Sequence, residues 1–237
     1  MRTVLITGAS RGIGAATARA FAQKGDRVII NYKTNREKAE ALAEELHGIA
    51  IGADVSDPLQ VKAMFKDIRT LTGSVDVLVN NAGFSQFAMF DSLLDEDWQA
   101  MLQTTLSGAF YCIREALPGM IHKKQGAIIN VSSIWGITGA SCEVAYSTAK
   151  AGLIGMTKAL AKEVGPSGIL VNCVAPGVID TDMSRHLSEE TRQELIEETP
   201  LCRLGSAQEV AKSIVFLAEP DHFISGQVLS PNGGIVI

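Results

Sequence analysis

Eight residues near the N-terminus, Thr7-Gly8-Ala9-Ser10-Arg11-Gly12-Ile13-Gly14, carry the clearest structural signal in this chain. They follow the apolar run Thr3–Thr7, which predicts a strand, and lead into the helical pattern Gly12–Lys24. Glycines in a strand-to-helix turn allow tight backbone geometry and let a pyrophosphate approach the amides of the helix N-terminus. The spacing is Gly-x3-Gly-x-Gly rather than GxGxxG, but its place after a first strand still predicts a phosphate-binding loop. The loop residues expected to bind a dinucleotide are Gly8, Ser10, Arg11, Gly12, Ile13 and Gly14.

Outward from this turn, short apolar runs alternate with longer segments of helical periodicity. This rhythm predicts a parallel sheet with helices on both faces, and strands that are apolar throughout are typical of a sheet covered on both sides. No repeat or linker divides the 237 residues, so we expect one Rossmann-type, doubly wound α/β domain over residues 1–237. Its seven expected strands are Thr3–Thr7, Arg27–Tyr32, Ile49–Ala53, Val75–Asn80, Ala127–Ser132, Leu170–Val174 and Gln227–Ser230, with helices that include Arg36–Leu46 and Pro58–Thr70.

The least regular stretch runs from residue 176 to residue 205. It contains a dense acidic segment with a helical pattern, Ser188–Glu198. An excursion beyond the carboxyl end of a strand is where a doubly wound fold would place a substrate lid. We therefore expect a lid around residues 178–204.

The bulk composition narrows the classes of partner and compartment. A net charge of −5 argues against a nucleic-acid-binding protein. The chain has no apolar run of the ~18 residues that a membrane span needs, and no cleavable signal pattern, so no membrane partner is expected. Its four cysteines form no CxxC pair and are expected to be reduced, which favours the cytoplasm. The histidines have no metal-ligand spacing, so no metal is expected.

The end of the second strand bears on the choice of dinucleotide. An NAD-preferring site places Asp or Glu there to accept hydrogen bonds from the ribose 2′-hydroxyl, and this chain has none. Lys33 and Arg36 follow instead, with Arg11 in the glycine loop, and such cations would pair with a 2′-phosphate. The pattern favours NADPH over NADH; the alternative is that Lys33 and Arg36 are ordinary surface charges.

The ends of the second and third strands add three residues to the expected cofactor site. These are Asn31, Asp54 and Val55. Asp54 has two interpretations that the sequence does not separate. Its carboxylate would accept a hydrogen bond from the adenine amino group, or it would cap the following helix together with Ser56 and Asp57.

A second motif, Tyr146-Ser147-Thr148-Ala149-Lys150, begins a helical pattern and carries the predicted chemistry. Tyrosine and lysine at i and i+4 share a helix face, and the ammonium is expected to lower the tyrosine pKa from ~10 toward neutrality. Tyr146 would then be the general acid for reduction of a carbonyl. Ser133, at the end of the preceding strand, would hydrogen-bond the carbonyl oxygen.

Together, Thr7–Gly14, Asn80-Asn81-Ala82-Gly83, Ser133, Tyr146 with Lys150, and Pro176-Gly177 strongly resemble the short-chain dehydrogenase/reductase family over essentially the whole chain. The resemblance implies that Asn81, Ala82 and Gly83 lie against the cofactor and that Lys150 also holds the nicotinamide ribose. It further implies that Pro176 and Gly177 abut the nicotinamide, and that Ile179 and Thr181 hold its carboxamide.

The chain departs from the family at one catalytic position. The family usually carries an asparagine in the helix before the serine strand, as part of a proton relay through tyrosine, lysine and water, and Thr105 stands in its place here. A hydroxyl can hold water but lacks the second set of partners of an amide. We expect a working but slower enzyme; the rival interpretation is a dinucleotide-binding module that has lost catalysis.

Within the family, the chain is most similar to the 3-oxoacyl-[acyl-carrier-protein] reductases, in length, in Tyr146–Val174 and in the ending Gly226–Leu229 with Gly233-Gly234. This implies a ketone bound to a carrier protein, and a homotetramer with the C-terminal strand in an interface. Lys123 and Lys124 match a basic position at which such enzymes dock the acidic carrier beside the site. The other such position is Ser167 and is not basic.

An alternative substrate comes from the loop before Tyr146. The segments Ser133-Ile134-Trp135-Gly136 and Gly139–Val144 resemble a branch that includes the elongation factor P 5-aminopentanone reductases, whose ketone is attached to a protein. Glu143 could pair with a cationic amine on such a substrate. Trp135 is equally explained by packing, and a free small ketone or a sterol also remains open.

Overall fold

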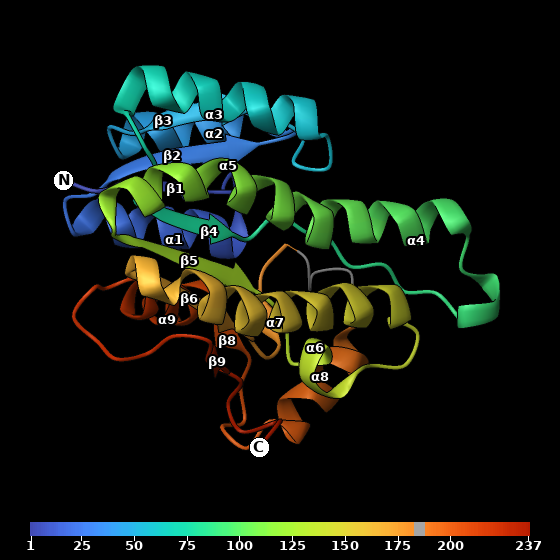
Figure 1. Ribbon diagram of the computed structural model, residues 1–237. Helices are drawn as coiled ribbons and strands as arrows, with labels where there is room; N and C mark the ends of the chain where they lie inside the picture. The colour runs from blue at the N-terminus through green and yellow to red at the C-terminus, as the bar shows by residue number, and fades with distance from the viewer. Residues whose placement is uncertain (183–187) are drawn as a thin grey trace.

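A seven-stranded, wholly parallel sheet forms the centre of the computed structural model, which describes residues 1–182 and 188–237 (Figure 1). The strand order is β3-β2-β1-β4-β5-β6-β9. This order confirms the predicted Rossmann-type, doubly wound class. The strands are β1 (Thr3–Ile6), β2 (Arg27–Tyr32), β3 (Ile49–Gly52), β4 (Val77–Asn80), β5 (Gly126–Val131), β6 (Ile169–Val174) and β9 (Val228–Leu229).

Helices cover both faces of the sheet and close two separate apolar layers. Along β1, Val4 and Ile6 belong to one layer and Leu5 to the other. Both sets are fully buried, which explains why the strands read as unbroken apolar runs. The first layer includes α1 (Gly12–Gln23), α2 (Arg36–Glu45) and α9 (Ala207–Leu217), and the second includes α3 (Pro58–Thr72), α5 (Gly108–Lys123) and α7 (Val144–Val164).

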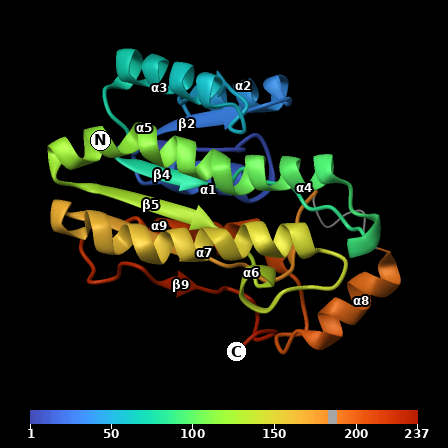
Figure 2. The ribbon, with the colours of Figure 1, turned by 45° about the vertical axis from the view of Figure 1, so that its right-hand side comes forward.

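Additional structure gathers beyond the carboxyl ends of the strands. In Figures 1 and 2, α4, α6 and α8 lie on the side toward which the β5 arrow points. Ligands of doubly wound folds bind at this edge of the sheet. The elements concerned are the short helix η1 (Phe90–Ser92), α4 (Asp95–Leu102), the π-helical turn η2 (Gln103–Ser107), α6 (Trp135–Thr138) and α8 (Glu189–Glu198), with a 3₁₀ turn η3 (Gly165–Ser167) elsewhere.

The predicted elements differ from the structure mainly at their ends. The strand expected from Val75 begins at Val77, because the backbone of Asp76 already bonds to Thr3 and Ala127 outside the regular ladder. The acidic segment is helical as expected, and the Ser188 hydroxyl caps α8 by accepting from the Thr191 amide at 3.1 Å.

The expected lid region contains a feature that the sequence did not suggest. Two short strands, β7 (Ile179–Asp180) and β8 (Gly205–Ser206), pair in parallel as a second sheet. Arg192 of α8 forms an ion pair with Asp180 at 3.2 Å, which ties the helix to β7. Residues 183–187, in the middle of the expected lid, lie outside the described residues.

The described residues contain no membrane-spanning helix, no cluster of metal ligands and no disulfide. No helix within residues 1–182 and 188–237 is long and apolar enough to cross a membrane. In the same ranges no three His, Cys, Asp or Glu side chains converge as metal ligands. All four cysteines are described and free, with Cys112 and Cys173 buried, which is consistent with the expected reduced state.

Candidate active site

A groove of about 350 Å³ lies at the carboxyl edge of the sheet and collects most of the residues predicted to bind a dinucleotide. They come from loops that are far apart in the sequence but follow the neighbouring strands β1, β2, β3 and β4. The predicted residues that line the groove are Gly8, Ser10, Arg11, Gly12, Ile13, Asn31, Lys33, Asp54, Val55, Asn81, Ala82, Gly83 and Thr181.

The glycines of the first loop have distinct roles. Gly8 and Gly12 adopt φ angles of +62° and +55°, in the left-handed region that favours glycine. Gly14 does not line the groove; a Cβ there would lie 2.7 Å from both Asn81 Nδ2 and the Gly8 carbonyl oxygen. Gly14 therefore acts by allowing helix α1 to pack closely on the loop beneath the groove.

The first turn of α1 fits a phosphate group. The N-cap residue Arg11 makes no side-chain cap hydrogen bond, and Gly12 and Ile13 of the first turn line the groove. Asn81 Nδ2 donates to the Thr7 and Gly8 carbonyl oxygens at 2.9 and 3.1 Å, which holds the loop in place. Uncapped amides at the positive end of a helix dipole bind anions, so this end of the groove suits a pyrophosphate.

Two cations that line the groove lie near carboxylates. Lys33 Nζ lies 2.7 Å from Asp54 Oδ2, and Arg11 lies 3.9 Å from Asp182. Arg36 pairs with Glu40 on α2 and is not among the residues that line the groove, so its expected role at a 2′-phosphate stays a prediction.

The two interpretations of Asp54 are partly separated by the structure. Helix α3 is capped by Asp57, whose carboxylate accepts from the Leu59 amide at 2.8 Å. Asp54 instead accepts from the amide and hydroxyl of Ser56, and its side chain faces the groove. The helix-cap interpretation of Asp54 is therefore wrong.

Other lining residues were missed by the sequence analysis. Three of them directly follow Asn31 and could have been found by extending the expected site along the loop after β2. The missed lining residues are Tyr32, Thr34, Asn35, Ala53, Phe84, Thr104 and Asp182.

The predicted catalytic side chains are all buried, with exposed fractions of 7% for Ser133, 8% for Tyr146, 4% for Lys150 and 2% for Thr105. Tyr146 and Lys150 lie one turn apart on α7, and Lys150 Nζ is 5.5 Å from the centroid of the Tyr146 ring. Lys150 Nζ donates to the Val131 carbonyl oxygen at 2.7 Å, which fixes the ammonium at the end of β5. The Ser133 hydroxyl accepts from the Trp135 amide at 3.2 Å.

The acidities of this group differ from the prediction. Burial raises the pKa of Tyr146 to about 12, although a hydrogen bond with Ser133 acts in the opposite direction. Burial lowers the pKa of Lys150 to about 8. The expected lowering of the tyrosine pKa is therefore wrong, because desolvation outweighs the hydrogen bond with Ser133. Tyr146 keeps its proton at neutral pH.

Thr105 lies in the π-helical turn η2, close to the lysine. A Cβ built on Gly83 would lie 3.4 Å from Thr105 Oγ1 and 3.6 Å from Lys150 Nζ. The hydroxyl and the ammonium therefore border the same small space, which the absence of a side chain at Gly83 keeps open. Short π-helical segments of this kind occur frequently at functional sites.

Apolar side chains surround Tyr146. The ring packs in a buried cluster with Met101, Ala145 and Ala149, against which Trp135 and Phe84 also pack. This contact supports the packing interpretation of Trp135. Farther out, the loop after β4 exposes three large apolar side chains, Phe87, Met89 and Phe90.

Three residues expected at the nicotinamide, Pro176, Gly177 and Ile179, are not among those that line the groove. Gly177 and Ile179 line a neighbouring hollow of about 180 Å³ rather than the groove. The Pro176 carbonyl oxygen accepts from the Ile134 amide at 3.0 Å, which brings this segment beside Ser133. Their contacts with a nicotinamide stay a prediction.

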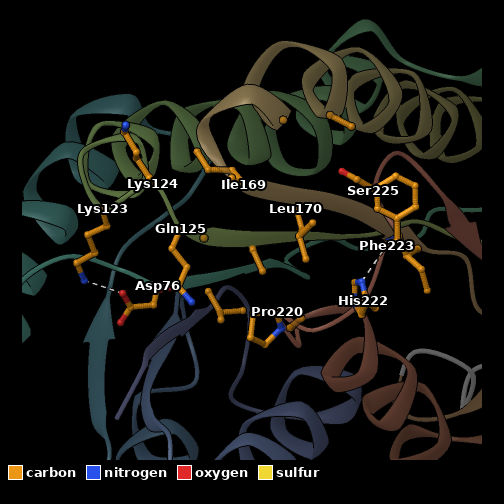
Figure 3. A pocket seen from close by; sticks show the side chains of 18 of the residues that line it. Asp76, Lys123, Lys124, Gln125, Ile169, Leu170, Pro220, His222, Phe223 and Ser225 are labelled. Atoms are coloured by element: carbon orange, nitrogen blue, oxygen red, sulfur yellow. Dashed lines mark hydrogen bonds and ion pairs between the residues drawn. The ribbon is translucent and has the colours of Figure 1, made fainter.

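The lysine pair expected at a carrier-protein dock lies elsewhere. Lys123 and Lys124 end α5, directly before β5 begins, and so lie at the amino edge of the sheet. There they line a hollow of about 850 Å³ (Figure 3), in which Lys123 Nζ pairs with Asp76 at 2.6 Å. Because Tyr146 lies at the carboxyl edge, these lysines do not flank the site of their own chain, and that expectation is wrong.

Known proteins match this chain over nearly its whole length. A family model described as Enoyl-(Acyl carrier protein) reductase matches residues 8–236. The chain is 41% identical to the 3-oxoacyl-[acyl-carrier-protein] reductase FabG of Staphylococcus aureus, covering 99% of this chain and 98% of that protein. Relatives with the same name from Aquifex aeolicus and Escherichia coli are 42% and 40% identical, each over at least 98% of this chain and 96% of their own length.

Proposed function

The chain belongs to the short-chain dehydrogenase/reductase family, and we propose that it is an NADPH-dependent reductase of 3-oxoacyl groups carried by acyl carrier protein. The observation that carries the proposal is the buried group of Ser133, Tyr146 and Lys150 at the same carboxyl edge as the glycine-loop groove. The full-length similarity to 3-oxoacyl-[acyl-carrier-protein] reductases supports this substrate class.

The chemistry assigned to the protein is the delivery of one proton to the carbonyl oxygen. Bound NADPH would supply the hydride that the carbonyl carbon accepts. Tyr146 donates its phenolic proton to the oxygen, which converts the ketone to a hydroxyl group, and the Ser133 hydroxyl holds that oxygen in place. The raised pKa of Tyr146 keeps the phenol protonated until the substrate arrives.

Lys150 and Thr105 assist Tyr146 after it has donated its proton. The Lys150 ammonium stabilises the phenolate left after proton transfer and holds the nicotinamide ribose. Tyr146 is almost fully buried, so its proton must return through the protein. The small space between the Thr105 hydroxyl and Lys150 has room for part of that path.

The preference for NADPH rests on the adenosine end of the groove. Lys33 and Arg11 line it, and the end of β2 has no carboxylate to bind a 2′-hydroxyl. A 2′-phosphate would meet two cations there.

An acyl substrate is favoured by the walls around Tyr146. Phe84, Trp135 and Leu93 pack beside the tyrosine, and Phe87 and Phe90 extend the apolar surface outward. An acyl chain gains free energy by covering such surface, about 25 cal/mol per Å².

A second candidate is a ketone that carries a cationic amine, as in elongation factor P 5-aminopentanone. The negative charge of Glu143 acts on Tyr146, where it raises the pKa of the phenol. A carboxylate whose charge acts on the reacting oxygen would also attract an amine on the substrate.

The test is a parallel assay of acetoacetyl-acyl carrier protein, 5-aminopentanone-modified elongation factor P and small ketones, each with NADPH and NADH. The proposal predicts the highest kcat/KM for the acyl carrier protein substrate with NADPH. Preference for the modified factor would identify the second candidate. Dinucleotide binding without turnover of any ketone would identify a module that has lost catalysis.

We also propose that the protein is a cytoplasmic homotetramer and that residues 178–204 form a substrate lid. Strand β9 is the last strand of the sheet, so its outer edge is available for contact with another chain. Free thiols favour a reducing compartment. Helix α8 lies beyond the carboxyl edge, where a lid would lie, and its Arg192 pairs with Asp180 of β7.

A further inference from the structure

We propose that Asp54 is a specificity-determining residue, which weakens the preference for 2′-phosphorylated dinucleotides by holding Lys33 as an internal counter-ion. The inference rests on the proposed function, in that the groove is taken to bind a nicotinamide dinucleotide. It goes further because it predicts that the protein's own carboxylate competes with the cofactor phosphate for one cation.

Asp54 is held by hydrogen bonds from Ser56, whereas the Lys33 side chain is largely exposed. Lys33 Nζ and Asp54 Oδ2 are 2.7 Å apart, and both residues line the groove. Asp54 Oδ1 accepts from the Ser56 amide at 2.9 Å and the Ser56 hydroxyl at 2.6 Å, and the Asp54 side chain is 20% exposed. The Lys33 side chain is 60% exposed, and its one ion pair among the described residues is with Asp54. The carboxylate is therefore fixed, and the ammonium is the group that must move or be shared.

The carboxylate is charged when the cofactor arrives. Burial raises the pKa of Asp54, but hydrogen bonds from Lys33 and Ser56 outweigh it and leave the pKa below its usual value. A 2′-phosphate entering beside Lys33 would meet this negative charge as well as the ammonium. A dinucleotide with a 2′-hydroxyl leaves the Lys33–Asp54 pair intact, so Asp54 acts against NADPH and not against NADH.

The other cations of this region do not compete in the same way. Arg36 pairs with Glu40 outside the groove, and Arg11 is 3.9 Å from Asp182, beyond hydrogen-bond distance. Lys33 thus lines the groove together with the carboxylate that pairs with it at 2.7 Å. A partly exposed ion pair of this kind changes binding by up to about fivefold, and the repulsion between carboxylate and phosphate adds to that.

The experiment measures binding of 2′,5′-ADP and 5′-AMP by calorimetry, with no ketone present. We expect Asp54→Asn to tighten 2′,5′-ADP about three- to tenfold and to change 5′-AMP less than about twofold. Asparagine keeps the acceptor for Ser56, so the loop is retained. The gain should be smaller when Asp54→Asn is made in a Lys33→Met background, because only the repulsion between carboxylate and phosphate is then removed, and it should shrink at high salt.

Asp57→Asn is the matched control, because Asp57 carries the same charge three residues away, caps α3 and does not line the groove. It should leave the ratio of the two affinities unchanged. The proposal is overturned if Asp54→Asn leaves 2′,5′-ADP affinity unchanged, weakens both ligands equally, or gives the same gain in a Lys33→Met background. Since these titrations contain no ketone, failure of the reductase assay would not affect them.

Discussion

The buried Lys150 ammonium lowers the stability of the folded protein but is needed for the proposed reaction. Its side chain is only 4% exposed, and burial lowers its pKa from 10.5 to about 8. A shift of that size corresponds to about 3 kcal/mol of stability that the charged form costs the folded protein at neutral pH. The residue is retained because the ammonium is needed beside Tyr146.

We predict that Lys150→Met abolishes ketone reduction and raises the free energy of unfolding at pH 7 by about 1–3 kcal/mol, measured by urea denaturation. The exposed Lys158, on the same helix, is the matched control, and Lys158→Met should change stability by less than about 0.5 kcal/mol. A Lys150→Met variant that is less stable than the wild type would contradict the assignment of a costly buried charge.

The same residue predicts a pH dependence of stability. Between pH 8 and pH 10.5 the unfolded chain binds more protons at Lys150 than the folded chain, so stability rises with pH in that window. The buried thiols of Cys112 and Cys173 act oppositely above about pH 9, because burial raises their pKa values to about 12 and about 11. The difference between wild type and Lys150→Met cancels the contribution of Cys112, which Lys150 does not affect, and should shrink from pH 8 upward.

Thr105 provides a gain-of-function test of the proton path. Thr105→Asn adds an amide beside Lys150 and should raise kcat at the pH values where return of the proton to Tyr146 limits the rate. The measurement is kcat against pH for both proteins, with cofactor affinity as the control for an undisturbed groove. An identical kcat profile would show that position 105 has no part in the path.

The sequence was sufficient to name Ser133, Tyr146 and Lys150, because the spacing along one helix face and the end of one strand brings them together. It could not give their acidities. Burial decides the pKa of Tyr146, and burial depends on Met101, Phe84 and other side chains from distant segments. The lysine pair at positions 123 and 124 was misplaced for a similar reason, because a motif match does not state which edge of the sheet it occupies.

At the scale of elements, those with a clear sequence period were predicted, and those that depend on tertiary contacts were missed. Long apolar strands and helices such as α3 were predictable because their periodicity is strong. The β7–β8 pair was not, since each strand has two residues and too little sequence to show a period. The π-helical turn at Gln103–Ser107 was also missed, because one extra residue in a helical turn leaves the apolar pattern nearly unchanged.

Substitutions at two glycines test how closely α6 and α7 pack at the site. A Cβ on Gly136 of α6 would lie 2.6 Å from Ser132 Oγ and 2.8 Å from the Lys150 backbone, whereas one on Gly155 of α7 meets nothing within 4 Å. We predict that Gly136→Ala costs about 1–3 kcal/mol and lowers activity, because α7 must shift at Lys150. Gly155→Ala should stabilise by about 0.5–1 kcal/mol, because alanine favours a helix.

Thermal or urea unfolding of both variants checks this pair. An equal effect of the two substitutions would contradict the close contact of α6 with α7. A loss of stability in Gly155→Ala would mean that another chain covers that face of α7.

For the whole molecule, the edge strand β9 carries the prediction about assembly. The sheet ends at Val228 and Leu229, and Leu229 is 38% exposed. Light scattering should give a mass about four times the 25.2 kDa of one chain. Leu229→Lys should reduce that mass, because a charge at the edge of a sheet disfavours pairing. A monomeric wild type would contradict the proposed tetramer.

The central claim, that the protein reduces a ketone with Tyr146 as proton donor, is tested most directly by Tyr146→Phe. The substitution removes one oxygen atom and retains the ring that packs against Met101, Ala145 and Ala149. We predict that kcat for acetoacetyl-acyl carrier protein with NADPH falls at least about 100-fold, while the Kd for NADPH changes less than about twofold. A variant that keeps more than about a tenth of the wild-type kcat would contradict the assignment of Tyr146.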